Sequence, residues 1–168
     1  YKKLISKIDE VNIDSPKRLI DGRVSAIRID APSFLTHNGF INYDRNVINI
    51  EKKAHESQHL FFGPYIEFPA GKFEVFFNFN NIDLGAEHRK NKNLILEVAS
   101  ERHGLLSSKK IEVDNSDCSL EFNIDAPVQQ IEFRVRAPKG FYGGLEFSGV
   151  TVTNKAHSSC EETESAKK

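Results

Sequence analysis

The stretch KFEVFFNFN, residues 72–80, alternates large apolar and polar side chains with a period of two. Successive side chains of a β-strand point to opposite faces, so this period predicts a strand with one face on a core. Phe76 breaks the alternation, because it falls on the polar side. The apolar side carries Phe73, Val75, Phe77 and Phe79, and the polar side carries Glu74, Asn78 and Asn80.

Two later stretches repeat this alternation: LEFNID at residues 120–125 and IEFRVRA at residues 131–137. Further strand-like segments lie near 24–30, 47–51, 60–68, 93–99, 110–114 and 145–153. About nine strands at this spacing are typical of an all-β sandwich. We therefore predict an antiparallel β-sandwich of the jelly-roll kind with a short N-terminal helix. Six residues are expected to share its core: Phe73, Val75, Phe77, Phe122, Phe133 and Val135.

The turn FPAGKF, residues 68–73, separates two of the expected strands. Pro69 fixes φ at a value that suits a turn, and Gly71 tolerates a positive φ. The sequence therefore predicts a tight hairpin with a bulge at this point.

The chain divides into one folded unit and two extensions. Leu4, Ile5, Ile8 and Val11 share one face of a helix, which predicts a helix over residues 1–12. We expect an N-terminal helix and linker at 1–20, the sandwich at 21–154, and a disordered polar tail at 155–168.

Composition narrows the classes of function. The 168 residues carry a net charge of −1, which argues against broad binding to nucleic acid or to an anionic membrane. No apolar run approaches the roughly 20 residues of a transmembrane helix. Cys118 lies in a turn-like segment and Cys160 in the polar tail, so no disulfide between them is expected. This favours a cytoplasmic location, with any contact to a membrane made through a parent protein.

The motif HESQH, residues 55–59, matches the zinc-protease pattern H-E-x-x-H. That chemistry needs a helix, because only a helix places the two histidines on one face with the glutamate beside the metal-bound water. Gly63-Pro64 would break a helix four residues after His59, and strand-like residues flank the motif on both sides. We therefore predict a loop between strands, with no metal and no cofactor.

The segment LFFGPYIEFPAGKFEVFFNF, residues 60–79, resembles part of the β-sandwich modules attached to bacterial enzymes of surface-polysaccharide assembly. Residues 94–113 and 131–152 look like the succeeding strands, and LEFSGVTVTN at 145–154 is similar to the last strand of jelly-roll carbohydrate-binding modules. The resemblance covers about residues 20–154. It implies a module without catalytic activity that binds a glycan such as an O-antigen (lipopolysaccharide) or capsule chain. By binding the glycan, the module would tether it to an adjacent catalytic or export domain.

Aromatic candidates for sugar contact are few, since the chain has no Trp. Tyr65, in Gly-Pro-Tyr, offers a ring and a hydroxyl, and its alternative role is packing at the edge of the sandwich. The loop KGFYGG, residues 139–144, offers Tyr142 between residues that allow close backbone approach. The alternative for this loop is a hairpin turn in which Phe141 caps the core.

Arg134 and Arg136 share the wetter face of one strand. The guanidinium fork suits a carboxylate, so these residues favour an acidic sugar whose ring rests on Tyr142. The alternative is ion pairing with Glu121 or Glu97 on neighbouring strands.

Two further candidates lie in predicted loops. Arg102 falls in SERHG, residues 100–104, and His59 precedes the Gly-Pro-Tyr strand, where a structural hydrogen bond is the alternative. The whole set of ligand-binding candidates is thus His59, Tyr65, Arg102, Arg134, Arg136 and Tyr142.

Three classes of function remain open. The first is a glycan-binding module, and the second is a structural or oligomerising sandwich without a ligand. The third is a hydrolase with a carboxylate pair assembled across strands, although no residue pair in the sequence stands out for that role. A broad exposed apolar face would favour the second class.

Overall fold

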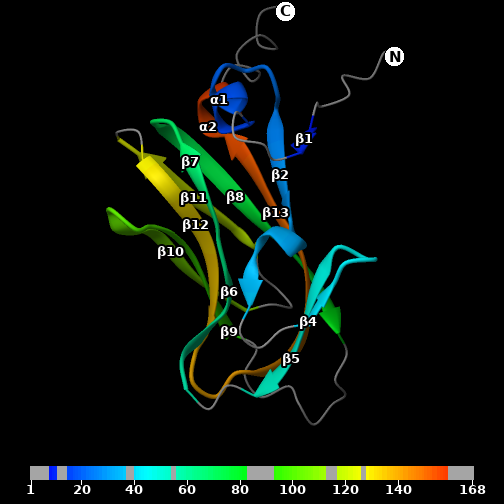
Figure 1. Ribbon diagram of the computed structural model, residues 1–168. Helices are drawn as coiled ribbons and strands as arrows, with labels where there is room; N and C mark the ends of the chain where they lie inside the picture. Colours follow the sequence, from blue (N-terminus) through cyan, green and yellow to red (C-terminus); the bar gives the residue numbers. More distant parts are fainter. Residues whose placement is uncertain are drawn as a thin grey trace, which may run out of the picture.

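Two β-sheets packed face to face make up the protein (Figure 1). The computed structural model describes residues 8–10, 15–36, 40–53, 56–82, 93–112, 117–125 and 128–158 of the 168-residue chain. Every described strand pair is antiparallel except β1 with β2. The predicted all-β antiparallel sandwich is therefore confirmed.

The seven-stranded sheet, called sheet A, is built around the strand β13 (Tyr142–Asn154). This strand pairs with three others, namely β2 (Ala26–Asp30), β5 (Val47–Lys53) and β8 (Gly71–Ile82). The other strands extend the sheet: β1 (Ile8–Glu10) beside β2, β4 (Phe40–Asn42) beside β5, and β11 (Ser119–Ile124) beside β8.

The six-stranded sheet, called sheet B, is built around β12 (Val128–Ala137). Its partners are β9 (Asn93–Ser100), β6 (Gln58–Phe62) and β7 (Pro64–Phe68). The outer strands are β10 (Gly104–Glu112) beside β9, and β3 (Leu35–Thr36) beside β6. A short 3-10 helix, η1 (Ala31–Ser33), connects β2 to β3.

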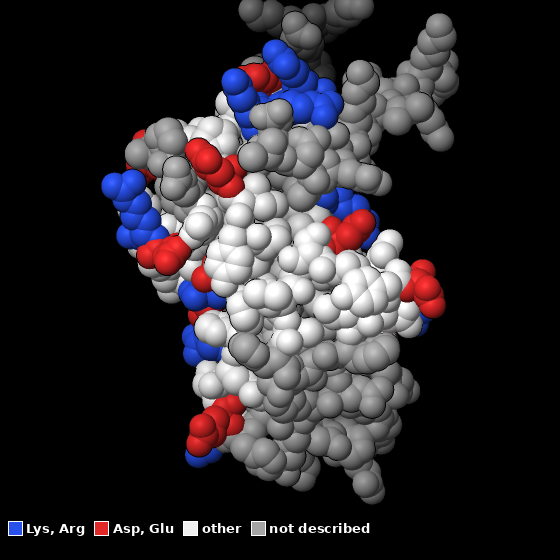
Figure 2. Space-filling view, viewed as in Figure 1, with Lys and Arg blue, Asp and Glu red and all other residues white. Residues whose placement is uncertain are grey.

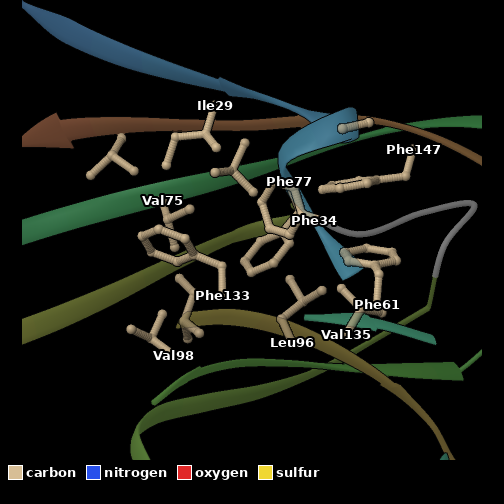
Figure 3. Close-up of a cluster of buried hydrophobic side chains, with 14 of the residues drawn as sticks. Ile29, Phe34, Phe61, Val75, Phe77, Leu96, Val98, Phe133, Val135 and Phe147 are labelled. Atoms are coloured by element: carbon tan, nitrogen blue, oxygen red, sulfur yellow. The ribbon is translucent and has the colours of Figure 1, made fainter. Parts of the chain in front are cut away.

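The core fills the space between the two sheets, and phenylalanine is its most frequent residue type (Figure 3). Phe61 and Phe147, from opposite sheets, stack with ring centroids 3.9 Å apart. Phe73 and Phe122 stack at 5.3 Å on the inner side of sheet A. All six residues predicted for the core have 3% or less of their surface exposed, so the period-two pattern placed them correctly.

The helix predicted over residues 1–12 is wrong where the structure describes that segment. Residues Ile8–Glu10 form β1, because their backbone pairs with β2 rather than with itself. The short N-terminal helix α1 lies later, at Ser15–Ile20. It ends before Gly22, whose φ of 67° suits the left-handed position that follows many helices. Leu19, 1% exposed, anchors α1 to the core.

The hairpin predicted at FPAGKF is also wrong. β7 pairs with β12 in sheet B, whereas β8 pairs with β11 and β13 in sheet A. Residues 69–70 therefore carry the chain from one sheet to the other. Turn-forming residues indicate that the chain reverses its direction, but they do not indicate which sheet the next strand joins. The strand expected at 60–68 is likewise divided at Gly63 into β6 and β7.

The polar tail begins with a short helix, α2 (Lys155–Ser158), which corrects the expectation of disorder for those four residues. The ammonium of Lys155 lies 3.2 Å from a carboxylate oxygen of Glu74 and 3.1 Å from one of Glu121. Residues 159–168, including Cys160, lie outside the described part of the chain. None of the described helices has the length and apolar character required to cross a bilayer.

Candidate functional site

Four of the six candidate residues lie on one surface, the side of sheet B that points away from the core. We call it the outer face of sheet B. Register defines it: Glu132, Arg134 and Arg136 on β12 stand opposite Ala99, Glu97 and Ile95 on β9. The intervening residues of β12 are buried in the core. His59 stands opposite Arg136, and Tyr65 lies on β7 beside Glu132.

Glu97 is the centre of this surface. Its carboxylate is buried, with 6% of the side chain exposed. Nε and Nη2 of Arg136 lie 3.2 Å and 3.1 Å from Oε1 of Glu97. Nε2 of His59 lies 3.4 Å from Oε2 of the same carboxylate. A buried carboxylate needs such partners, because an unpaired buried charge is strongly unfavourable.

The two arginines are therefore held in place by the protein. Nη1 of Arg136 also donates to Oγ of Ser57 at 3.0 Å. Nε of Arg134 lies 3.3 Å from Glu97 Oε2, where the geometry gives an electrostatic contact without a hydrogen bond. Glu121 and Glu97 were the two ion-pair partners expected for the arginines. The structure contains the pairing with Glu97.

Tyr65 occupies an unusual backbone position. Ile66 stands opposite Ile131 and Pro64 opposite Glu132, so Tyr65 is the extra residue of a bulge in β7. Its φ is 66°, in the left-handed region that bulky side chains rarely adopt. The side chain nevertheless remains 44% exposed.

The hydroxyl of Tyr65 is tied to the charged row beside it. Burial raises the pKa of Tyr65 above its ordinary value, and the charge of Glu132 and a hydrogen bond with it act in the same direction. The phenol therefore stays protonated and donates to Glu132. Glu132 in turn accepts from Nη1 of Arg134 at 3.3 Å. A row of polar and charged side chains thus runs from Tyr65 through Glu132, Arg134 and Glu97 to His59.

Arg102 and Tyr142 are not part of this row. Arg102 is exposed in the turn between β9 and β10, which confirms it as a loop-tip residue. The charge of Glu101, in the same turn, contributes to the raised pKa of Tyr65, so the turn lies near that end of the surface.

Tyr142 was expected in a loop beside Arg136, but it begins β13 in sheet A. Its side chain lies outside the described residues. The neighbouring Phe141 is 1% exposed, so the alternative in which it caps the core is confirmed. The connection at 138–141 is not a hairpin, however, because it joins sheet B to sheet A.

The described residues of the zinc-protease motif, 56–59, form no helix. Gln58 and His59 form the start of β6, Glu56 lies in a bend, and Ser57 connects the bend to the strand. His55 lies outside the described residues. In the part of the chain that the structure describes, no three His, Cys, Asp or Glu side chains are grouped as metal ligands would be.

Charge on this side of the molecule is mixed in sign. In Figure 2, seen from the same side as Figure 1, basic and acidic atoms alternate down the flank where β9, β10 and β12 lie. An alternating surface of this kind offers both donors and acceptors of hydrogen bonds. It does not form the broad basic patch that nucleic acid requires.

The sequence named Glu97 only as one of two possible partners of the arginines, and it did not indicate that this carboxylate is buried at the centre of the surface. A glutamate in NLILEVAS, residues 93–100, reads as an ordinary outward position of a strand. Only the placement of β12 next to β9 puts Arg134 and Arg136 over it. The strain at Tyr65 was equally hidden, because the bulge depends on register.

No protein-family model and no curated protein matches the chain. Among solved structures, a chain of the Glycosylation Associate Protein (Gap123) complex from Streptococcus agalactiae is similar over 86% of this chain, with a TM-score of 0.51 and 13% identity. The match covers 29% of that longer chain. At this identity the likeness concerns the fold alone.

Two more distant structures have related shapes. The low-affinity xylan-binding module CBM86 from Roseburia intestinalis matches 79% of this chain and 98% of its own, with a TM-score of 0.47 and 10% identity. A family two carbohydrate esterase from Cellvibrio japonicus matches 78% of this chain and 34% of its own, with a TM-score of 0.41 and 14% identity.

Proposed function

We propose that the chain is a non-catalytic carbohydrate-binding domain that holds a sugar against Tyr65 on the outer face of sheet B. The observation that carries this proposal is the backbone of Tyr65, fixed at φ 66° with the ring exposed. A conformation of this kind costs roughly 1–3 kcal/mol and persists where the surroundings impose it, most often at ligand sites. Contact with a ligand explains this strained and exposed tyrosine better than packing does.

The chemistry of the surface suits a sugar. A pyranose ring has an apolar C–H face that can lie on the flat phenol, while its hydroxyls both donate and accept. Glu132 offers acceptors, and Arg134 and His59 offer donors, along one row. Glu97 already orients Arg134 and His59, so less side-chain freedom is lost on binding.

The proposed ligand is recognised through hydroxyls and not through a carboxylate. All three nitrogens of the Arg136 guanidinium already face Glu97 or Ser57, so the free fork expected for an acidic sugar is absent there. Arg134 faces Glu97 and Glu132. For this reason we propose a neutral segment of a polysaccharide as the ligand, in place of the acidic sugar that the sequence led us to expect.

The wider setting of the proposal rests on the sequence resemblance. In it, the glycan is a bacterial surface polysaccharide such as an O-antigen or a capsule chain, and the domain keeps it near an adjacent catalytic or export domain in the cytoplasm. The chain spans 29% of the Gap123-complex protein that it matches, which is compatible with a module inside a larger machine.

The oligomerising alternative has weaker support. The large apolar side chains that the structure records as exposed are scattered over both sheets: Leu35, Tyr43, Tyr65, Phe76 and Leu105. Scattered apolar residues are ordinary on a soluble protein, whereas interfaces need a contiguous patch. The described surface therefore favours a ligand over a second copy.

The test is a titration of the chain with matched neutral and acidic fragments of bacterial O-antigen and capsule, followed by calorimetry. We expect weak binding of neutral fragments that Tyr65→Ala reduces about tenfold or more. Tyr43→Ala removes a tyrosine that is 70% exposed in the turn between β4 and β5, and it should leave binding unchanged. Equal binding by wild type and Tyr65→Ala would overturn the site, and failure of every fragment to bind would overturn the function.

A further inference from the structure

Phe76 is the residue that breaks the alternation of β8. Its neighbours Val75 and Phe77 are buried in the core, whereas Phe76 is 37% exposed on the opposite side of sheet A. We call that side the outer face of sheet A. Of the exposed large apolar side chains that the structure records, Phe76 is the one at the middle of this face. An aromatic ring there contributes nothing to the core, and the outer face of sheet B lies on the other side of the molecule.

Polar side chains surround Phe76 on the neighbouring strands. Ser119 on β11 and Thr151 on β13 stand directly opposite it, and Arg28 on β2 stands opposite Thr151. Nδ2 of Asn78 donates to Oγ1 of Thr151 at 3.3 Å. Hydroxyl and amide groups on β11, β8 and β13 thus lie beside the ring, and β8 runs between the other two strands (Figure 1). Glu74, two residues before Phe76 on β8, contacts Lys155 on the same face.

A second row of hydrogen-bonding groups lies four residues further along β8. Nδ2 of Asn80 donates to Oε1 of Glu146 at 3.0 Å, and Nη2 of Arg45 lies 2.9 Å from Oε2 of the same carboxylate. Glu146 is 8% exposed, so its partners fix its position. The two rows are roughly 13 Å apart, the rise of four residues in an extended strand.

We propose that the outer face of sheet A is a second glycan-binding surface, on which a neutral polysaccharide chain runs along β8 with one sugar ring stacked on Phe76. The amides and hydroxyls beside the ring match the hydroxyls of a neutral sugar. Charged groups on this face have partners of opposite sign: Glu74 and Glu121 contact Lys155, Arg28 pairs with Asp30 at 2.7 Å, and Arg45 pairs with Glu146.

Other occupants fit this surface less well. A protein partner would need a larger apolar centre than one ring, because binding hot spots are clusters of desolvated side chains. An anionic membrane or nucleic acid would need unpaired basic residues, and the two arginines described here have acidic partners. A neutral glycan requires what the face provides, namely one flat ring and a lattice of hydrogen-bonding groups.

Two such surfaces on opposite sheets would let one domain hold two polysaccharide segments at once. The two sites share no residue, so each can fail without the other. Binding at sheet A alone would support this inference and overturn the proposed site at Tyr65. Binding at sheet B alone would support the proposed site at Tyr65 and overturn this inference.

The experiment is a titration of the ¹⁵N-labelled full chain with three neutral linear hexasaccharides, cellohexaose, xylohexaose and mannohexaose, followed by NMR. We expect at least one of them to shift amide resonances of β8 and β13 around Phe76, Asn78 and Thr151. Phe76→Leu keeps an apolar side chain and removes the flat ring, and it should weaken these shifts about tenfold or more. Phe76→Tyr keeps the ring and should retain them.

The control is Leu105→Ala, which removes an exposed apolar side chain from β10 in sheet B. It should leave the shifts of β8 and β13 unchanged. Titrations in which none of the hexasaccharides shifts those strands would overturn the inference, and so would a Phe76→Leu variant that binds as wild type does.

Discussion

Arg136 and Glu97 lie on adjacent strands of sheet B, and two nitrogens of the arginine contact one oxygen of the buried carboxylate at 3.2 Å and 3.1 Å. His59 and Arg134 approach the other oxygen. One acidic side chain therefore organises three basic or ionisable ones from two different strands. The order of the outer face of sheet B depends on this carboxylate.

Replacing Glu97 with Gln should destabilise the fold by about 1–3 kcal/mol. Breaking a buried ion pair costs about 3–5 kcal/mol when one partner is removed, and the partly exposed arginines reduce this loss. Urea denaturation would measure it. Glu121→Gln is the matched control, because that side chain is 69% exposed and should lose under about 0.5 kcal/mol. Equal losses in the two variants would show that Glu97 is not the centre of the surface.

Glycine should be better tolerated than alanine at position 65. Alanine keeps the positive φ of Tyr65 at a penalty of roughly 1 kcal/mol, and glycine removes that penalty. At Phe76, in a regular part of β8, the order should reverse, since glycine weakens a strand. Thermal unfolding of the four variants tests both orders. A Tyr65→Ala variant more stable than Tyr65→Gly would contradict the strained bulge.

Gly149 should tolerate no side chain. A Cβ at that position would lie 2.1 Å from the carbonyl oxygen of Ile29, and the residue has φ 124°. Gly149→Ala should therefore cost several kcal/mol, by overpacking and strain together, on the order of 3. Gly104→Ala shares a positive φ, 69°, but has no atom within 4 Å of the new Cβ, so only about 1 kcal/mol should be lost. Comparable losses would mean that contact with Ile29 is relieved elsewhere.

Cys118 should react slowly with iodoacetamide. Burial raises the pKa of this thiol, and the charge of Asp117 acts in the same direction. At pH 8 the folded chain therefore holds less thiolate, which is the reactive form, than the unfolded chain does. Alkylation in a Cys160→Ser background, with and without urea, measures the difference. A folded-state rate that equals the unfolded rate would contradict the effect of burial.

Phe133→Ala should cost about 3–5 kcal/mol, the usual penalty for truncating a fully buried phenylalanine. Phe76→Ala, on the outer face of sheet A, should cost much less. Chemical denaturation of the two variants gives the comparison, and similar values would contradict the assignment of their faces.

The sequence predicted well those strands that have one face buried in the core and one face exposed to solvent. Phe73, Phe122 and Phe133 were identified as core because a half-buried strand must alternate, whatever its neighbours are. The same argument fails for Ile8, since a short segment with helical spacing adopts whichever structure its tertiary partners offer. Local pattern therefore predicted the faces of the strands and not their partners.

The candidate site shows the same division. His59, Tyr65, Arg134 and Arg136 were chosen by chemistry, and the structure brings them together on one surface. Tyr142 was joined to Arg136 because the two are near in sequence, but β12 and β13 belong to different sheets. The pairing of β9 with β12 also places Arg134 and Arg136 in contact with Glu97. Proximity across strands is set by register, which a single sequence does not contain.

The placement of β13 has a consequence for how the protein folds. Its three partners, β2, β5 and β8, all come earlier in the chain, and β2 and β5 are distant from it in sequence. Pairing over such separations closes large loops before any contact is gained, so folding should be slow for a domain of this size. Until β13 arrives, three strand edges of sheet A stay unsatisfied and open to pairing with other chains. A cut within residues 142–154 would therefore yield an open, aggregation-prone sheet and not a smaller sandwich.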